Sequence, residues 1–391
     1  MPILPLILFE WSIRQENVKS LKKVIIIGGG LSGLIASIEL IEADFEVILI
    51  EKKKYPFHRV CGEYISNEVL SYLQRRNMLP QRSDIPQIQT FKFTSIKGKQ
   101  VEMNLDLGGF GISRYELDNH LCMMAKSLGV YVLEQTSVIS VEFDHEMFKL
   151  ETSNGQFLEA PLVIGAYGKS SILDKKLNRD FTQKRSPFLG VKYHIRGNHP
   201  KHEVSLHNFE GGYCGLSAIE ESKFNLCYLG SRETLKKYGS ISEMEEAVLC
   251  KNPFLYEIFK NSEFIFDQPE VINEFSFAPK KLIENHIFMA GDAAGLITPL
   301  SGNGMAMAIH SGKILADSIK CHTTELTFNR DAIEQDYSKQ WNQLFKRRLW
   351  VGRKTQKLFG SKITSELTAV TMNSLPFIGR AIMKNTHGQP F

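Results

Sequence analysis

The sequence predicts an α/β protein, and three observations support that prediction. Residues 23–51 read as a strand, a glycine-rich turn, a helix and a second strand. Residues 287–309 contain another short apolar strand, then a loop rich in glycine, then a helix of small residues. Apolar and polar residues alternate at 88–105 and again at 188–195, which indicates strands of a half-exposed sheet. Residues 241–262 and 331–360 have helical patterning.

Length and composition are those of a large folded protein. The chain has 391 residues, of which 43% are hydrophobic and 23% are charged, so disordered and collagen-like classes are excluded. The run Met1–Phe9 is less than half a membrane span, and it lacks the basic start and cleavage site of a signal peptide. We therefore expect residues 1–20 to be an extension ahead of the fold.

The distribution of cysteine and histidine predicts no metal site. The six cysteines are scattered, and none forms a C-x-x-C pair. Without a secretion signal, reduced thiols in the cytoplasm are expected. Four histidines, His194, His199, His202 and His207, fall within 14 positions. They surround a turn-forming stretch, so a solvated hairpin is favoured over a metal site.

The first signature is the G-x-G-x-x-G pattern at residues 28–33, directly after the apolar strand Lys23–Ile27. Gly28 permits a tight turn, and Gly30 lets the backbone approach a pyrophosphate. Gly33 allows the following helix to lie close to the strand. The free N–H groups at the start of that helix bind phosphates. This pattern, between two strands, predicts a dinucleotide site.

An acidic residue follows at the expected distance. Glu51 ends the second strand and lies 18 residues after Gly33. A carboxylate at this position accepts hydrogen bonds from an adenosine ribose, and it argues against a ribose 2′-phosphate.

The second signature resembles the second FAD fingerprint of the glutathione-reductase-type flavoproteins. A strand runs into Gly291-Asp292, and the glycine-rich loop leads to a helix from about Gly304 to Ser318. In that family the aspartate, here Asp292, binds the ribityl hydroxyls of FAD. The helix N-terminus, here Gly302–Met305, points at the flavin. Its positive dipole stabilises an anionic reduced flavin.

Three shorter stretches agree with this resemblance. Arg59–Ser66 resembles the C-G-x-x-[IL]-S stretch that runs along the flavin in geranylgeranyl reductases and related hydroxylases. Ser113–Leu121 resembles a helix start whose arginine, here Arg114, approaches FAD. Leu162–Ser171 resembles the A-D-G-x-x-S segment of aromatic hydroxylases, but Tyr167 replaces the aspartate. In that group the aspartate is associated with FAD and NADPH, so direct reduction by NADPH is expected to be inefficient.

Residues 22–320 thus resemble the FAD-dependent group that spans aromatic-ring monooxygenases, geranylgeranyl reductases and flavin halogenases. The resemblance implies a discontinuous, Rossmann-like FAD-binding domain with an inserted β-sheet substrate domain and a helical C-terminal tail. The predicted parts are an extension (1–20), the FAD-binding domain (21–87, 106–180 and 276–330), the substrate domain (88–105 and 181–275) and the C-terminal segment (331–391).

Both signatures and the shorter stretches supply the residues predicted to bind FAD. They are Gly28, Gly30, Leu31, Ser32, Gly33, Glu51, Lys52, Arg59, Cys61, Gly62, Arg114, Val138, Gly168, Gly291, Asp292, Pro299, Gly302, Asn303, Gly304 and Met305.

The favoured function is an FAD-dependent monooxygenase that hydroxylates an apolar, phenolic or lipid-tailed small molecule through a flavin C4a-hydroperoxide. One alternative is a reductase of prenyl-chain double bonds, in which Cys61 donates a proton or contacts the flavin edge. Another is a non-catalytic electron-transfer flavoprotein. Tyr213 is a candidate for substrate contact or simply a strand aromatic. A halogenase is disfavoured because the W-x-W-x-I-P motif of that subgroup is missing from the sequence.

The partners follow from the same reading. With no second dinucleotide fingerprint in the sequence, NAD(P)H is expected to bind transiently, or an electron-donor protein delivers the electrons. Residues 341–391 hold nine Lys/Arg and one acid, Glu366, with an amphipathic stretch at Leu344–Trp350. This segment is either a solvated helix face or a peripheral contact with the inner face of a membrane. Nucleic acid is not expected, because the tail has few interleaved aromatic residues and the body is acidic.

Overall fold

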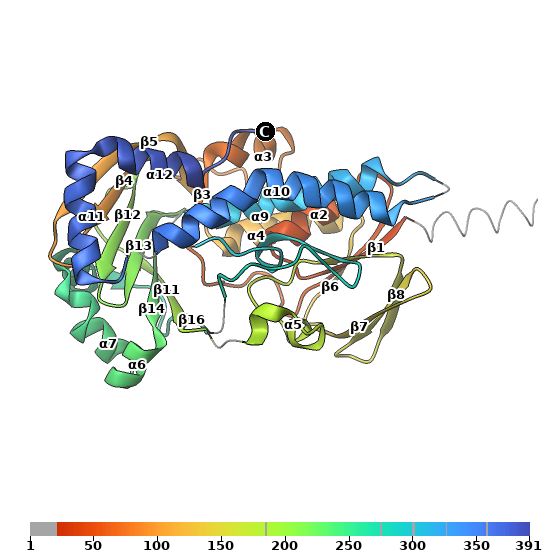
Figure 1. Ribbon diagram of the computed structural model, residues 1–391, viewed down its shortest axis with the longest axis horizontal. Coiled ribbons are helices and arrows are strands. Elements are labelled where there is room, and N and C mark those ends of the chain that lie inside the picture. Colours follow the sequence, from red (N-terminus) through yellow and green to blue (C-terminus); the bar gives the residue numbers. More distant parts are fainter. Residues whose placement is uncertain (1–21, 184–185, 274–275, 299–301, 326, 357–358) are drawn as a thin grey trace, which may run out of the picture.

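The structure of the protein is a computed structural model. It describes residues 22–183, 186–273, 276–298, 302–325, 327–356 and 359–391, so the predicted extension at residues 1–20 lies outside the described residues. Two large sheets lie side by side along the long axis, and a long helix crosses in front of them (Figure 1). Within the described residues, no helix combines the length and apolarity needed to cross a membrane.

The first sheet has six strands. In spatial order they are β17 (Ile283–Glu284), β18 (Ile287–Met289), β10 (Leu162–Gly165), β1 (Lys23–Ile27), β2 (Glu46–Ile50) and β6 (Tyr131–Leu133). All neighbours are parallel except β17 and β18. The central strands are continuous apolar runs because both faces of a parallel sheet are covered. Helix α2 (Leu31–Ile41) lies on β1 and β2, and α4 (Arg114–Ser127) and α9 (Gly304–Cys321) pack against α2.

This sheet brings the two sequence signatures together. Strands β1 and β18 both pair with β10 in parallel. The turn at Gly28 and the turn at Gly291 therefore leave the sheet at the same, carboxyl-terminal edge, where α/β proteins bind their ligands.

The second sheet has nine strands and is mostly antiparallel. In spatial order they are β15 (Glu263–Phe264), β11 (Phe188–Arg196), β14 (Phe224–Ser231), β13 (Gly212–Ala218), β12 (Glu203–Phe209), β4 (Gln87–Thr94), β5 (Gln100–Gly111) and β3 (Tyr64–Ser66), with β16 (Glu270–Asn273) also on β11. The alternating segments of the sequence form these strands. The predicted domain boundaries stay predictions.

The remaining short elements surround the two sheets. A third sheet contains β7 (Val138–Asp144), β8 (Met147–Thr152) and β9 (Phe157–Ala160). The short helices are η1 (Asn67–Val69), α3 (Leu70–Arg75), α5 (Ile172–Lys176), η2 (Asp180–Gln183), α6 (Arg232–Tyr238), α7 (Ile241–Ala247), η3 (Leu249–Lys251), α8 (Pro253–Asn261) and η4 (Gly291–Ala293).

One helix prediction needs correction. The helix expected over residues 241–262 is divided into α7, η3 and α8. Asn252 caps α8 by accepting a hydrogen bond from the Phe254 N–H at 2.9 Å, and Pro253 is its first residue. Proline lacks an N–H and cannot continue a preceding helix, so a new helix starts there.

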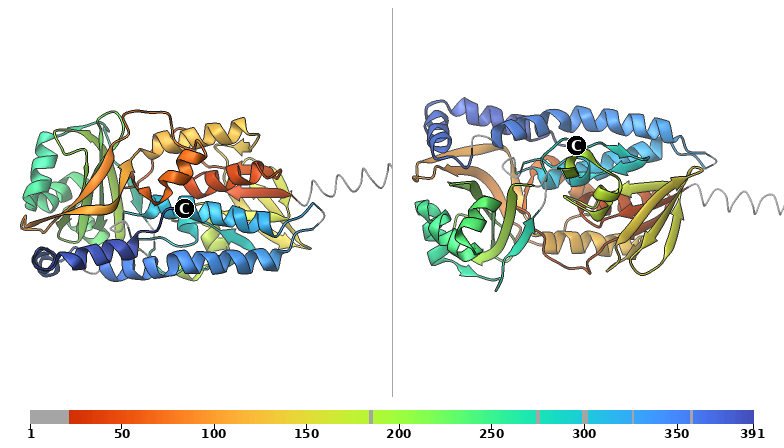
Figure 2. Two further views of the ribbon diagram at one scale, coloured as in Figure 1. Left: turned by 90° about the horizontal axis from the view of Figure 1, so that it is seen from above. Right: turned by 60° about the horizontal axis from the view of Figure 1, so that its bottom comes forward.

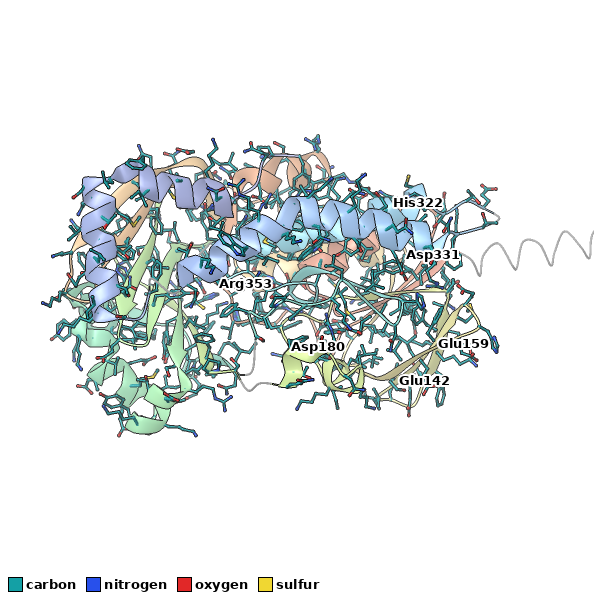
Figure 3. The ribbon with its side chains drawn as sticks, in the orientation of Figure 1. Glu142, Glu159, Asp180, His322, Asp331 and Arg353 are labelled. Atoms are coloured by element: carbon teal, nitrogen blue, oxygen red, sulfur yellow. The ribbon has the colours of Figure 1, made fainter. Side chains whose placement is uncertain are left out.

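The C-terminal segment forms three helices, α10 (Arg330–Thr355), α11 (Lys362–Ser374) and α12 (Pro376–Thr386). Helix α10 crosses the molecule from Asp331 at one end to Arg353 near the nine-stranded sheet (Figure 3). Seen from above, α10, α11 and α12 line one long side of the molecule (Figure 2, left).

The amphipathic stretch predicted at Leu344–Trp350 faces the protein more than the solvent. Phe345 is completely buried and Leu349 is 6% exposed, whereas Trp350 is 56% exposed. Phe345 lies edge-on to His310 of α9, so this part of α10 is anchored on the body of the protein.

The last residues also contact the protein's own body. The Asn303 side-chain amide donates to the Thr386 carbonyl at 3.0 Å, and the Gly388 N–H donates to Glu68. The Phe391 ring stacks on His310, with 3.7 Å between ring centroids. Thr386–Phe391 is thus held against Asn303, Glu68 of η1 and His310 of α9.

Candidate functional site

A cavity of about 790 Å³ lies where the carboxyl-terminal edge of the six-stranded sheet meets the nine-stranded sheet. Its walls come from the β1–α2 turn, the end of β2, residues 57–64, the start of α9 and one face of the nine-stranded sheet. Helices α11 and α12 also contribute lining residues.

The glycine turn is shaped to receive a phosphate group. Gly28 has φ +106°, and a Cβ there would lie 2.5 Å from the Ala166 carbonyl oxygen, so only glycine forms this turn. A Cβ on Gly30 would meet only the Arg114 Nη2, at 3.6 Å, so the space beside it is open. Helix α2 begins at the next residue with no side-chain cap, which leaves its first N–H groups for an anion. These features fit the pyrophosphate of FAD.

Glu51 is held at the end of β2. Its side chain is 3% exposed, and Oε2 accepts hydrogen bonds from the Gly29 N–H at 2.9 Å and Arg59 Nη2 at 3.1 Å. Oε1 accepts from the Lys53 N–H at 3.0 Å. These donors fix a carboxylate that lines the cavity and retains acceptor capacity for ribose hydroxyls.

Two arginines are fixed by one buried carboxylate. Asp118 accepts from Arg59 Nε at 3.0 Å and from Arg114 Nε at 2.6 Å. Both arginines line the cavity, next to the glycine turn and to residues 60–62. Because Asp118 fixes their orientation, both guanidinium groups can bind a phosphate group at the cavity wall.

The Asp292 turn is held from behind by two cations that no sequence motif indicated. Lys280 Nζ donates to the Asp292 carbonyl at 2.8 Å, and burial lowers the pKa of Lys280 to about 8. Arg179 Nη2 donates to the Ala293 carbonyl at 3.0 Å. Only the fold shows that these residues reach the turn, because both lie in segments without periodic patterning.

Most predicted FAD-binding residues line the cavity. They are Gly28, Gly30, Leu31, Ser32, Glu51, Lys52, Arg59, Cys61, Gly62, Arg114, Val138, Gly168, Asp292, Gly302, Gly304 and Met305.

Four of the predicted FAD-binding residues are placed differently. Gly33, Gly291 and Asn303 lie behind the cavity wall, and Pro299 falls outside the described residues. A Cβ on Gly33 would lie 2.1 Å from the Gly28 carbonyl oxygen, so Gly33 permits the close approach of α2. The individual FAD contacts stay predictions.

The other end of the cavity is apolar, and we call it the apolar lobe. Its residues come from the nine-stranded sheet, the loop after Asp292 and the C-terminal helices. They are Phe91, Phe93, Leu206, Tyr213, Leu216, Leu229, Ile272, Leu296, Phe359, Met372 and Met383. Such walls suit an apolar ligand.

Both sequence candidates for catalysis reach the cavity. Cys61 is partly exposed and lines it between the Arg59 and Gly62 positions. Tyr213 lies on β13, is 3% exposed, and packs edge-on to Phe359 with 5.8 Å between ring centroids. Tyr213 therefore serves as a strand aromatic, and it also faces the apolar lobe.

A buried ionic cluster fixes the Cys61 segment. Glu63, at φ +55°, is completely buried; it binds Lys192 Nζ at 2.5 Å and His194 Nε2 at 2.7 Å. Burial opposes its ionisation, but Lys192 and His194 outweigh burial and hold the pKa of Glu63 at about 2. Asn225 of β14 donates to the Cys61 carbonyl at 3.0 Å. The segment is thereby tied to the nine-stranded sheet.

The solvated hairpin predicted for the histidines is wrong for two of them. His194 and His207 are each 2% exposed, because both point from strands into buried layers. His207 Nδ1 lies 2.9 Å from Thr94 Oγ1. Among the described residues no His, Cys, Asp and Glu groups are arranged to hold a metal ion.

Residues 22–326 match the protein family described as "FAD binding domain". The chain belongs to this family. It is therefore an FAD-binding member of a group of flavin-dependent oxidoreductases, as the two signatures and the cavity indicate.

Curated relatives carry several different activities in their names. Digeranylgeranylglycerophospholipid reductase of Methanosarcina acetivorans is 23% identical over 83% of this chain and 82% of its own length. Menaquinone reductase of Mycobacterium tuberculosis is 20% identical over 75% of each chain. Conditioned medium factor receptor 1 of Dictyostelium discoideum is 22% identical over 76% of this chain. The chain spans 62% of the length of that relative.

Solved structures share the fold at low identity. The flavin-dependent brominase Bmp2 aligns with a TM-score of 0.74 and 17% identity over 92% of each chain. PqsL of Pseudomonas aeruginosa, described as a probable FAD-dependent monooxygenase, aligns with a TM-score of 0.69 and 15% identity. That alignment covers 88% of this chain and 98% of PqsL.

Proposed function

We propose that the protein is an FAD-dependent monooxygenase that hydroxylates an apolar, phenolic or lipid-tailed small molecule. The observation that supports this most is the apolar lobe, which adjoins the residues that fit FAD within one cavity. Lipid-tailed molecules reside in membranes, so the proposal includes contact with a membrane surface through residues 341–391.

The protein's own residues contribute orientation and a dry pocket. FAD, when bound and reduced, supplies the electrons for oxygen activation. The aromatic and aliphatic walls exclude water and hold the tail of the substrate. We assign Tyr213 to substrate contact, because it lies on the sheet face that closes the apolar lobe.

A prenyl-chain reductase is the second candidate, and the position of Cys61 favours it. Cys61 lines the cavity beside the predicted FAD-binding residues Arg59 and Gly62. Its carbonyl accepts a hydrogen bond from Asn225, which fixes this part of the chain at the cavity wall. In this reading the thiol donates a proton to the substrate.

We propose that the electrons come either from NAD(P)H, bound transiently, or from an electron-donor protein. Tyr167 occupies the place of the family aspartate, and its hydroxyl donates to Asp174 Oδ1 at 3.1 Å while accepting from Arg179 Nη1 at 3.3 Å. These hydrogen bonds hold the Tyr167 side chain against the protein's own residues.

A product mass scan tests the proposal. The FAD-loaded protein is reduced and given lipid-tailed phenols or prenyl lipids, with and without air. An air-dependent product heavier by one oxygen atom supports the monooxygenase. A product heavier by two hydrogens without air supports the reductase. Electron transfer to an acceptor, with no changed substrate, contradicts both and supports an electron-transfer flavoprotein.

A further inference from the structure

Large apolar side chains are exposed in one part of the C-terminal segment. Of the thirteen large apolar side chains exposed within the described residues, six lie between residues 350 and 377. They are Trp350 (56%), Ile363 (80%), Leu367 (63%), Val370 (45%), Leu375 (43%) and Phe377 (60%), and we call them the docking face. Single exposed apolar residues are ordinary, but a concentration of this kind marks an interaction surface.

Helix α11 is apolar on two sides. Ile363, Leu367 and Val370 follow helical spacing on the exposed side. On the other side, Ala369 and Met372 are buried against the nine-stranded sheet, and Met372 lines the cavity. The fold therefore buries Ala369 and Met372. It leaves Ile363, Leu367 and Val370 exposed.

Basic residues accompany the docking face. Lys354 Nζ lies 5.7 Å from the centroid of the Trp350 ring. The one acid of residues 341–391, Glu366, pairs with Lys99 at 3.7 Å and accepts from the Lys97 N–H at 3.0 Å. Both of these lysines are exposed. Other exposed basic residues of the segment are Lys346, Arg347, Lys362 and Lys384.

We propose that the docking face binds the surface of an anionic lipid bilayer. Apolar side chains flanked by cations match the acyl boundary and the headgroup phosphates of such a surface. A second copy of this chain fits poorly, because two segments of net charge +8 would face one another. Helices α10, α11 and α12 lie along one long side, as a broad surface contact needs (Figure 2).

This proposal deepens the function proposed above. It rests on that function for the identity of the molecule taken from the bilayer, which is the lipid-tailed substrate. Thr368 and Met372 of α11 and Met383 of α12 line the cavity from within. Only the thickness of one helix, about 10 Å, therefore separates the docking face from the apolar lobe. A lipid-tailed substrate would move from the bilayer into the cavity over this short distance.

Vesicle co-sedimentation of the full-length, FAD-loaded protein tests the proposal. The probes are vesicles of phosphatidylcholine alone and of phosphatidylcholine mixed with phosphatidylglycerol. The double variant Ile363→Ser/Leu367→Ser removes apolar surface from the docking face. Met123→Ser/Phe157→Ser is the matched control, because these side chains are 64% and 78% exposed on α4 and β9 and do not line the cavity.

The wild type and the control should bind the anionic vesicles, and more weakly at high salt. The docking-face variant should bind about tenfold less, since two apolar side chains no longer enter the interface. No binding by the wild type, or equal binding by both double variants, would overturn the proposal. So would a wild-type dimer in size-exclusion chromatography that the docking-face variant converts to a monomer.

The docking-face variant also separates this proposal from the proposed chemistry. Ile363 and Leu367 do not line the cavity. Flavin absorbance and turnover of a detergent-dispersed substrate should therefore match those of the wild type. A protein that binds vesicles but oxygenates no substrate would contradict the proposed function alone.

Discussion

Glu63 and Lys192 form an ion pair in which both side chains are completely buried, with Oε1 and Nζ 2.5 Å apart. The two residues are 129 positions apart in the chain. The pair joins the segment beside Cys61 to strand β11, so it links the two halves that enclose the cavity. A buried charge is tolerated only while its partner is present.

Removing either partner alone should destabilise the protein strongly. We expect Glu63→Gln or Lys192→Met to lower the free energy of unfolding by about 3–5 kcal/mol, because Lys192 loses its counterion in the first variant and Glu63 keeps only His194 as a partner in the second. The double variant should be less destabilised than the sum of the two single variants. Urea unfolding measures all three, and single variants within about 0.5 kcal/mol of wild type would contradict the expectation.

Glu245 should make stability depend on pH near neutrality. Its Oε1 accepts from Tyr193 at 3.0 Å and Tyr228 at 2.8 Å, and burial raises the pKa of Glu245 to about 7. The folded state holds this proton more tightly than the unfolded state, whose pKa is the ordinary 4.5. The contribution to stability is thus complete below about pH 4.5 and is lost as the pH rises to about 7.

The variant Glu245→Gln keeps the acceptor oxygen and removes the titration. It should be more stable than wild type at pH 8, by up to about 3 kcal/mol, and gain much less at pH 5. Thermal unfolding at the two pH values measures this. A gain of the same size at both would show that ionisation of Glu245 is not its cause.

Two glycines of the first signature should respond differently to substitution. At Gly30 a side chain would project into open space at the cavity, so Gly30→Val should lose FAD while the FAD-free protein keeps its stability. At Gly33 a Cβ would collide with the Gly28 carbonyl oxygen. We expect Gly33→Ala to lower the free energy of unfolding by about 2–4 kcal/mol.

Flavin content and urea unfolding of the FAD-free proteins separate the two effects. If Gly30→Val retained full flavin, the cavity beside the glycine turn would not be the pyrophosphate site.

Asp292 should be required for retention of FAD. Its side chain is placed at the cavity by the turn that Lys280 and Arg179 hold from behind. Asp292→Ala should weaken FAD binding by about a hundredfold, as expected for lost hydrogen bonds to a charged acceptor, and give colourless protein. The exposed Asp180→Ala is the control. A yellow Asp292→Ala protein with undiminished flavin would refute the assignment.

Local sequence signals were sufficient to predict the strands and turns of the six-stranded sheet that carry the two signatures. Apolar β-branched runs indicated β1, β2 and β18, and glycine spacing indicated the turns that follow them. These signals are short-range, so they survive in a single sequence. Parallel pairing with β10 then brings Gly28 and Asp292 to one edge, which is a general property of such sheets.

Long-range pairing could not be predicted in this way. Lys192 and His194 occupy strand positions where a polar side chain normally indicates exposure, yet both contact Glu63 inside the protein. No spacing rule connects positions 63 and 192. For the same reason Phe345 was expected in an amphipathic surface stretch, because its partner His310 is visible only in the fold.

Helices α11 and α12, which close the apolar lobe, lie near the end of the chain, and this has a consequence for folding during synthesis. Met372 and Met383 close the apolar lobe from helices that follow residue 361, after both sheets have been translated. A nascent chain that has emerged only as far as α10 would expose Phe93, Leu206 and Leu229 along an uncovered sheet face. Docking of α11 and α12 is therefore a late folding event, and the ribosome-bound protein is most prone to aggregation just before it.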